Sequence, residues 1–105
     1  MANHKKFTEL LQRSFLLKAM GLTNQQIEAA LASRKYDTDE DAIEQHCTRI
    51  NEFYKSAEGY RSMERSISKA WENGDLLRLI KKYRKEFLPY IEAFEKKVVI
   101  PFVNL

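Results

Sequence analysis

The chain has 105 residues, of which 44% are hydrophobic, 31% charged and 11% aromatic. This length corresponds to one domain with its own hydrophobic core, which excludes global disorder. Three glycines and two prolines are too few for an all-β protein with many tight turns, and a single cysteine, Cys47, excludes a disulfide scaffold and a four-cysteine metal site.

The net charge of +3 is too small to indicate a nucleic-acid partner, but its distribution is uneven. Residues 1–36 carry six basic and two acidic side chains, residues 37–75 five basic and ten acidic, and residues 76–105 seven basic and three acidic. We therefore expect an acidic face and a basic face. With no long apolar stretch and no signal-peptide core, we expect a cytoplasmic protein, or one in a host cytosol if it is a secreted effector.

The first predicted helix covers about residues 5–19, where apolar residues recur at helical spacing. Gly21 follows it as the glycine that ends a helix. A second helix begins after Thr23, which can form a capping box with Gln26, and continues to about Ser33. Its inward face is predicted to carry Ile27, Ala30 and Leu31.

A long third helix is predicted over residues 39–72, with Asp37 or Thr38 as its cap. The alternative is two helices with a break near Gly59, because a glycine inside a helix costs about 1 kcal/mol. The positions of the predicted inward face keep heptad spacing throughout. They are Ile43, His46, Ile50, Phe53, Ala57, Tyr60, Glu64, Ile67 and Trp71.

A tight turn is predicted next, in which Gly74 ends one helix and Asp75 caps the following one. The last helix is predicted over residues 76–97, and Pro89 should kink it or divide it near Leu88. The two long helices are then expected to form an antiparallel hairpin with matched aromatic seams.

The predicted fold is therefore all-α, in a single domain. A small helical unit at residues 5–50 leads into the hairpin at residues 51–97, followed by an apolar tail at residues 98–105. The β-branched residues of the tail favour an extended conformation. The tail either folds back on the bundle or adds as a strand to a partner or to a second copy.

No catalytic residues, metal site or cofactor are expected. His46 and Cys47 are adjacent, but neighbouring side chains on a helix diverge by about 100° and cannot face each other. The chain also lacks the G-x-S-x-G and H-E-x-x-H motifs and a glycine-rich phosphate loop. We expect His46 to pack at the edge of the third-helix seam and Cys47 to be a small buried apolar residue.

Two charged surfaces are candidate binding sites. The acidic run at residues 37–44 combines helix capping with a surface for a basic partner. A basic stripe on the last helix is a phosphate-binding surface, a dock for an acidic protein, or a solvated helix face. The stripe consists of Arg78, Lys81, Lys82, Arg84 and Lys85.

Three short motifs, Met20-Gly21-Leu22, Ala30-Leu31 and Ala42-Ile43-Glu44, stand at nearly the spacing of a known module. On these motifs, about residues 9–50 resemble the ubiquitin-associated domain, a compact three-helix bundle. In that family the Met-Gly loop and the end of the third helix bind ubiquitin. The pair His46-Cys47 stands where the family usually has two leucines, and Leu22 where it prefers an aromatic residue. The resemblance implies a partner-binding patch of Met20, Gly21, Leu22, Asp41, Glu44 and Cys47.

The same region offers a second resemblance. Residues 21–27, together with the spacing of Ile43, His46 and Ile50, resemble the helix-turn-helix of LuxR-type regulators. This resemblance implies that the unit binds DNA.

These observations predict a non-enzymatic protein–protein interaction module, a small helical adaptor or inhibitor that docks on a larger protein. The partner would be ubiquitin or an enzyme that the module regulates. The alternative is a nucleic-acid-binding regulator that uses the helix-turn-helix-like unit and the basic stripe. Self-association is a third prediction, because heptad seams pair between chains as readily as within one. No membrane partner is expected.

Overall fold

All the regular elements in the computed structural model are helices. The structure describes residues 2–55 and 60–97, and these ranges contain six helices and no strand. The prediction of an all-α fold is confirmed. The helices are α1 (Ala2–Ala19), α2 (Asn24–Ala32), α3 (Glu40–Phe53), α4 (Tyr60–Glu72), α5 (Asp75–Tyr83) and α6 (Leu88–Lys97).

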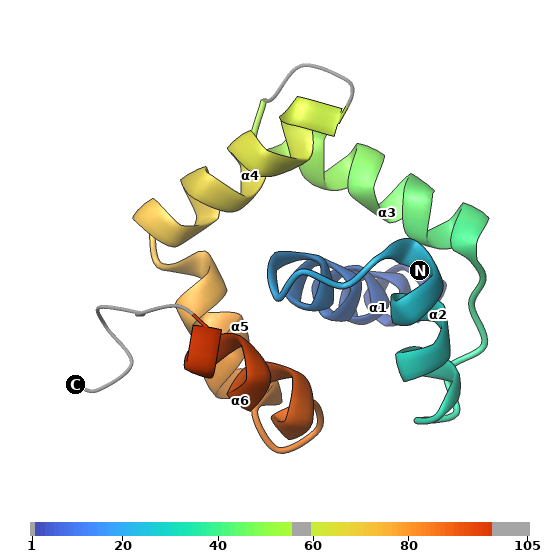
Figure 1. Cartoon of the computed structure of the whole chain (residues 1–105). Coiled ribbons are helices and arrows are strands. Elements are labelled where there is room, and N and C mark those ends of the chain that lie inside the picture. Colours follow the sequence, from blue (N-terminus) through green and yellow to red (C-terminus); the bar gives the residue numbers. More distant parts are fainter. Residues whose placement is uncertain (1, 56–59, 98–105) are drawn as a thin grey trace.

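Helix α1 is the central element of the fold. It packs against α2, α3 and α5, while α2 also contacts α3, and α4 contacts both α3 and α5. Figure 1 shows α3, α4 and α5 following one another as an arch around α1. Both long predicted helices are divided in the structure, the first into α3 and α4 and the second into α5 and α6.

Helix α1 ends as the sequence predicts, at a glycine. Gly21 has a φ of 97°. This conformation is unfavourable for any residue that has a side chain, but not for glycine. The Leu22 amide donates to the Leu17 carbonyl at 3.2 Å, and the Gly21 amide donates to the Lys18 carbonyl at 3.0 Å. These two bonds form a Schellman motif, which turns the chain towards α2.

The predicted capping box at the start of α2 is confirmed. The Gln26 amide donates to the Thr23 hydroxyl at 3.2 Å, and the Thr23 amide donates to the Gln26 side chain at 2.8 Å. The predicted inward residues of α2 are all buried. They are Ile27, Ala30 and Leu31.

Helix α2 ends in the same motif as α1, but without a glycine. Lys35 takes a φ of 68°, and the Tyr36 amide donates to the Leu31 carbonyl at 3.0 Å. This left-handed backbone conformation is strained for lysine, whereas glycine would adopt it without that cost in free energy. The strained turn brings the Tyr36 side chain back against the core.

Helix α3 begins later than its predicted cap. The Asp39 carboxylate accepts the Ala42 amide at 2.8 Å, so Asp39 is the N-cap. The prediction that Asp37 or Thr38 caps this helix is therefore wrong. All three residues have side chains that can cap a helix, so residue type alone does not distinguish them.

The prediction of one helix over residues 39–72 is also wrong. Helix α3 ends at Phe53, Tyr54 adopts φ −86° and ψ 4°, and Lys55 has a φ of 56°. The Tyr54 carbonyl, which the helix end leaves open, accepts from the Lys69 ammonium at 2.8 Å. Gly59, the predicted weak point, lies outside the described residues, as do Ala57 and the predicted tail at residues 98–105.

The turn between α4 and α5 contains Gly74 at a φ of 85°, as expected for the glycine that ends a helix. Gly74 is also the N-cap of α5, so the prediction that Asp75 caps this helix is wrong. Asp75 is instead the first residue of α5, and its carboxylate accepts the Tyr54 hydroxyl at 2.7 Å. The Asn73 side chain accepts the Asp75 amide at 3.0 Å.

The predicted division near Pro89 is confirmed. Helix α5 ends at Tyr83, and α6 begins at Leu88. Pro89 lies in the first turn of α6, where its missing N–H removes no intrahelical hydrogen bond. The turn between the two helices places Phe87 fully in the core.

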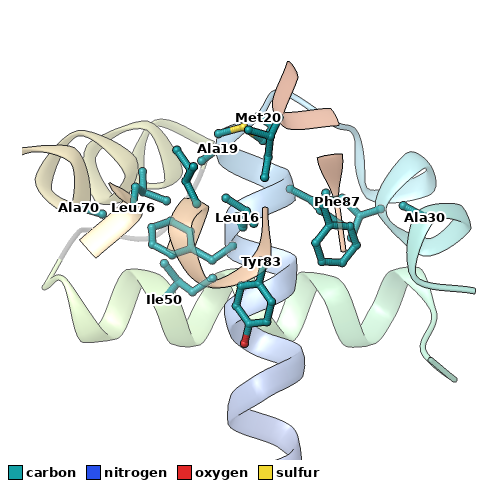
Figure 2. Close-up of a cluster of buried hydrophobic side chains, with 14 of the residues drawn as sticks. Leu16, Ala19, Met20, Ala30, Ile50, Ala70, Leu76, Tyr83 and Phe87 are labelled. Carbon is teal, nitrogen blue, oxygen red and sulfur yellow. The ribbon is translucent and has the colours of Figure 1, made fainter. Parts of the chain in front are cut away.

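The core surrounds the second half of α1 and draws on every helix. Figure 2 shows Leu16 of α1 among side chains from α3, α4 and α5, including Ile50, Ala70 and Leu76. Two polar pairs are buried with the core, which satisfies hydrogen bonds that burial would otherwise leave open. The Ser14 hydroxyl lies 3.0 Å from His46 Nδ1, and the Ser66 hydroxyl donates to the Asn51 side chain at 2.7 Å.

Candidate functional site

Four of the predicted partner-binding residues line one groove. Gly21, Leu22, Glu44 and Cys47 border a space of about 590 Å³ between the α1–α2 turn, α3 and α4. We call this space the Gly21 groove. The sequence resemblance therefore grouped residues that are close together in the structure.

Two other residues of the predicted patch lie elsewhere. Met20 is only 8% exposed and belongs to the core, as Figure 2 shows, so its side chain is unavailable to a partner in this conformation. Asp41 is exposed in the first turn of α3 and is not among the residues that line the Gly21 groove. The patch implied by the resemblance is thus smaller than expected.

Helix α4 forms one wall of the Gly21 groove. It contributes Met63, which is 7% exposed, and Ile67, which packs against the core. The opposite wall carries a hydrogen bond from the Lys18 ammonium to the Asn24 side chain at 2.7 Å. A partner must therefore fit between α4 and the α1–α2 turn, against a mixture of polar and apolar groups.

His46 and Cys47 face different parts of the molecule. His46 is 2% exposed, and burial together with the Arg49 charge lowers its pKa. Cys47 is half-buried in the Gly21 groove, and burial raises the pKa of its thiol, which keeps the thiol protonated. The expectation that Cys47 is fully buried is therefore only partly met. In the described ranges no three His, Cys, Asp or Glu side chains cluster as metal ligands.

The predicted basic stripe is divided in the structure. Arg84 pairs with Glu95 at 2.7 Å, and Arg78 pairs with Asp75. Lys81 and Lys85 are exposed, but Lys85 lies in the turn after α5 rather than on the helix. The sequence predicts one helix face with Arg78, Lys81, Lys82 and Lys85, and Arg84 nearby, but α5 ends before Lys85.

A second groove, which the sequence does not predict, lies between α1, the end of α3 and α5. Its volume is about 520 Å³, and its lining is mostly apolar. Phe53 stands at this groove with 75% of its surface exposed, in contrast to the buried Phe15 on the opposite helix. We call this space the Phe53 groove.

Aromatic rings form the floor of the Phe53 groove. The Tyr54 ring lies 5.7 Å from the Phe15 ring and meets the Phe53 ring edge-on at 4.9 Å, measured between centroids. The Tyr54 hydroxyl is fixed by its hydrogen bond to Asp75. Burial and this carboxylate raise the pKa of Tyr54, so the phenol remains a neutral donor. The floor is thus anchored to both α1 and α5.

Cations border the Phe53 groove on two sides. Arg49 comes from α3, whereas Arg78 and Lys82 come from α5. The Lys82 ammonium donates to the Gln12 side chain at 3.0 Å, which holds the lysine at the rim. The groove therefore combines an apolar floor with basic edges, a pattern suited to an amphipathic anionic partner.

The sequence contained a signal for this site, but the signal was ambiguous. Phe53 occupies an inward position of the heptad pattern and was expected to lie in the core. The helix ends at Phe53, however, and the next residue, Tyr54, packs on Phe15 in its place. An aromatic pair at the end of a helix is the only local hint that one ring remains outside.

Comparisons with known proteins give no indication of the function of either groove. No protein-family model, no curated protein and no solved structure matches the chain significantly. The resemblance to the ubiquitin-associated domain stays a prediction, although α1, α2 and α3 do pack against one another as a three-helix unit. None of the helices in residues 2–55 and 60–97 has the length and apolarity to cross a membrane.

Proposed function

We propose that the chain is a non-enzymatic protein-interaction module, a small helical adaptor or inhibitor that docks on a larger protein in the cytoplasm. The docking surface is the Phe53 groove. The observation that carries the proposal is Phe53 itself, a large apolar side chain that is 75% exposed beside an apolar groove. A single unpaired thiol, Cys47, fits the reducing conditions of the cytoplasm.

The energetics favour this groove as an anchor point. Covering a large apolar side chain contributes about 1.5–3 kcal/mol, and aromatic anchors carry much of the binding energy of protein interfaces. Two residues that line the groove, Phe15 and Ile50, are 4% and 2% exposed and belong to the core. Because the floor is already fixed, little ordering free energy is lost when a partner binds.

Site-specific photo-crosslinking in the source cells tests the proposal. A benzophenone amino acid is placed at Phe53 and, as a control, at Leu88, the other large hydrophobic residue exposed among the described residues. We expect a discrete crosslink to a larger protein from position 53 and none from position 88. Crosslinks of equal pattern from both positions would contradict the proposal.

Affinity measurements with the captured protein complete the test. Phe53→Ala should weaken binding by at least about ten-fold, whereas Leu88→Ala should leave the dissociation constant unchanged. The melting temperature should not change in Phe53→Ala, because the side chain is mostly exposed, so lost binding is distinguishable from lost folding. Equal affinity for Phe53→Ala and the wild type would exclude the Phe53 groove as the docking surface.

Ubiquitin is a second candidate partner, supported by the grouping of Gly21, Leu22, Glu44 and Cys47 in the Gly21 groove. An NMR titration of the labelled chain with ubiquitin tests it. If ubiquitin binds there, the amide signals of Gly21, Leu22 and Cys47 shift in a saturable way. Absence of shifts at about millimolar ubiquitin excludes this partner.

A further inference from the structure

We propose that the Phe53 groove selects one kind of occupant: an amphipathic helix of a partner protein with acidic residues on both flanks of its apolar face. This inference rests on the proposed function and adds the chemistry of the partner. It follows from how cations, aromatic rings and the single acid are arranged around the groove.

The cations stand on two separate walls of the groove, one on α3 and two, spaced by one helical turn, on α5. On α3, Arg49 lies four positions before Phe53, and on α5, Arg78 lies four positions before Lys82. Residues four apart share one face of a helix, about 5–6 Å from each other. A helix seated in the groove therefore meets positive charge along both of its sides.

The groove stays electropositive despite one acid. Among the described residues that line it, Asp75 is the only carboxylate, and it already accepts the Tyr54 hydroxyl at 2.7 Å and pairs with Arg78. Lys82 donates to Gln12, and its ammonium has two further protons to donate. Carboxylates on the partner would meet the Lys82 ammonium without displacing an internal acid, and they would also meet the positive charge of Arg49.

The apolar floor sets the second requirement. The rim charges alone could attract phosphate, but a nucleic-acid backbone has no apolar face to cover Leu11 and Leu79, which also line the groove. A small amphiphile inside the groove would leave the Phe53 ring largely in water. An amphipathic helix covers the floor and Phe53 together and presents polar residues to the rim.

Three synthetic helical peptides with one shared apolar face test this selectivity. Their flanking positions carry Glu, Gln or Lys, and binding to the full chain is measured by fluorescence anisotropy. We expect the Glu peptide to bind about ten-fold more tightly than the Gln peptide, and the Lys peptide to bind more weakly than both. Added salt should reduce this difference.

Neighbouring lysines on α5 provide matched variants. Lys82 lines the groove, whereas Lys81 is exposed and does not line it, so Lys82→Gln and Lys81→Gln remove the same charge at two different places. Lys82→Gln should weaken binding of the Glu peptide about three-fold, and Lys81→Gln should leave its binding unchanged. Lys81→Gln should also leave binding of the Gln peptide unchanged.

The outcomes separate this inference from the proposed function. If the Glu and Gln peptides bind equally and Phe53→Ala weakens both, the groove binds helices but the acidic preference is wrong. If no peptide binds, or Phe53→Ala binds all of them like the wild type, both proposals fail at this groove. A concentration-dependent dimer that Phe53→Ala abolishes in sedimentation experiments would show that a second copy is the occupant, and would overturn the inference.

Discussion

Arg13 and Glu86 are 73 positions apart in the chain, yet Arg13 Nε lies 2.7 Å from a Glu86 carboxylate oxygen. The Arg13 guanidinium also lies over the rings of Tyr36 and Tyr83, at 4.6 and 4.7 Å from their centroids. The Tyr36 hydroxyl donates to the same carboxylate at 2.9 Å. This cluster ties the N-terminal helices to the turn between α5 and α6.

Arg34 strengthens the same junction. Its guanidinium donates to the Glu86 carbonyl at 2.8 Å and lies 4.8 Å from the centroid of the Phe87 ring. Because both arginines reach one turn, residues 9–50 and the C-terminal helices form a single packed body. The Phe53 groove is likewise lined by residues from both parts of the chain, on α1, α3 and α5.

Glu86→Gln should lower the free energy of unfolding by about 1–2 kcal/mol at neutral pH, because the charge-assisted hydrogen bonds lose their carboxylate. Glu95→Gln is the matched control. It breaks the more exposed Arg84–Glu95 pair and should cost less than about 1 kcal/mol. Urea unfolding measures both, and equal losses would show that the Arg13 cluster contributes no more than a surface ion pair.

The stability of the fold should depend on pH through the same Glu86 carboxylate. Burial raises the pKa of Glu86, but the hydrogen bonds from Arg13 and Tyr36 and the charges of Arg13 and Arg34 outweigh burial, so the pKa lies below its ordinary value. The stabilisation is therefore complete above the ordinary glutamate pKa of about 4.3 and is lost as the pH falls through the lower folded-state value. In Glu86→Gln this acid-induced loss should be smaller than in the wild type.

We expect a second pH dependence of stability, at higher pH, from the titration of His46. Burial and the charge of Arg49 lower its pKa in the folded state, so below about pH 6.5 the unfolded chain binds the proton more readily. Stability should therefore fall as the pH drops below about 6.5 in the wild type, and it should level off below the lower folded-state pKa. His46→Gln should remove most of this slope, and His4→Gln should keep it. An unchanged slope in His46→Gln would show that His46 does not titrate differently on folding.

The all-α fold and several helix ends were predictable from the sequence, because apolar spacing and caps are local properties. Gly21 and Pro89 mark helix ends by their backbone chemistry and Thr23 by its side-chain hydroxyl, and the structure confirms each of these predictions. The break after Phe53 was not predictable in this way. The heptad pattern continues across it, and Tyr54 leaves the helix because of contacts with Phe15 and Asp75, which are distant in sequence.

The candidate site shows the same limit. The Gly21 groove was found because its residues belong to short motifs, although Met20 turned out to be buried. The Phe53 groove joins three helices, and its exposed ring occupies an inward position of the pattern. Only the packing of α5 against α1 decides that Arg78 and Lys82 stand at that groove.

Lys35→Gly should raise the free energy of unfolding by up to about 1 kcal/mol, because Lys35 holds a left-handed conformation that glycine adopts without strain. Lys35→Ala is the control, since it removes the charge but keeps the strain. We expect the alanine variant to match the wild type in thermal unfolding. A stabilisation of equal size in both variants would attribute the effect to the charge.

The divided basic stripe predicts weak binding to nucleic acid. Arg78 and Arg84 are engaged in ion pairs with Asp75 and Glu95, which reduces the positive charge available to phosphates. In a salt-titrated mobility-shift assay we expect no submicromolar complex with DNA or RNA. A submicromolar, salt-sensitive complex that is lost in the Lys81/Lys82/Lys85→Ala triple variant would favour the nucleic-acid-binding alternative.

Chemical-shift mapping tests whether the Phe53 groove is the docking surface, because it reports which groove a helix occupies. The labelled chain is titrated with the Glu-flanked amphipathic peptide, and shifts are followed residue by residue. We expect the largest saturable shifts at Phe53, Tyr54 and Leu79, with Gly21 and Cys47 unaffected. Shifts centred on Gly21 and Cys47, or none at saturating peptide, would contradict it.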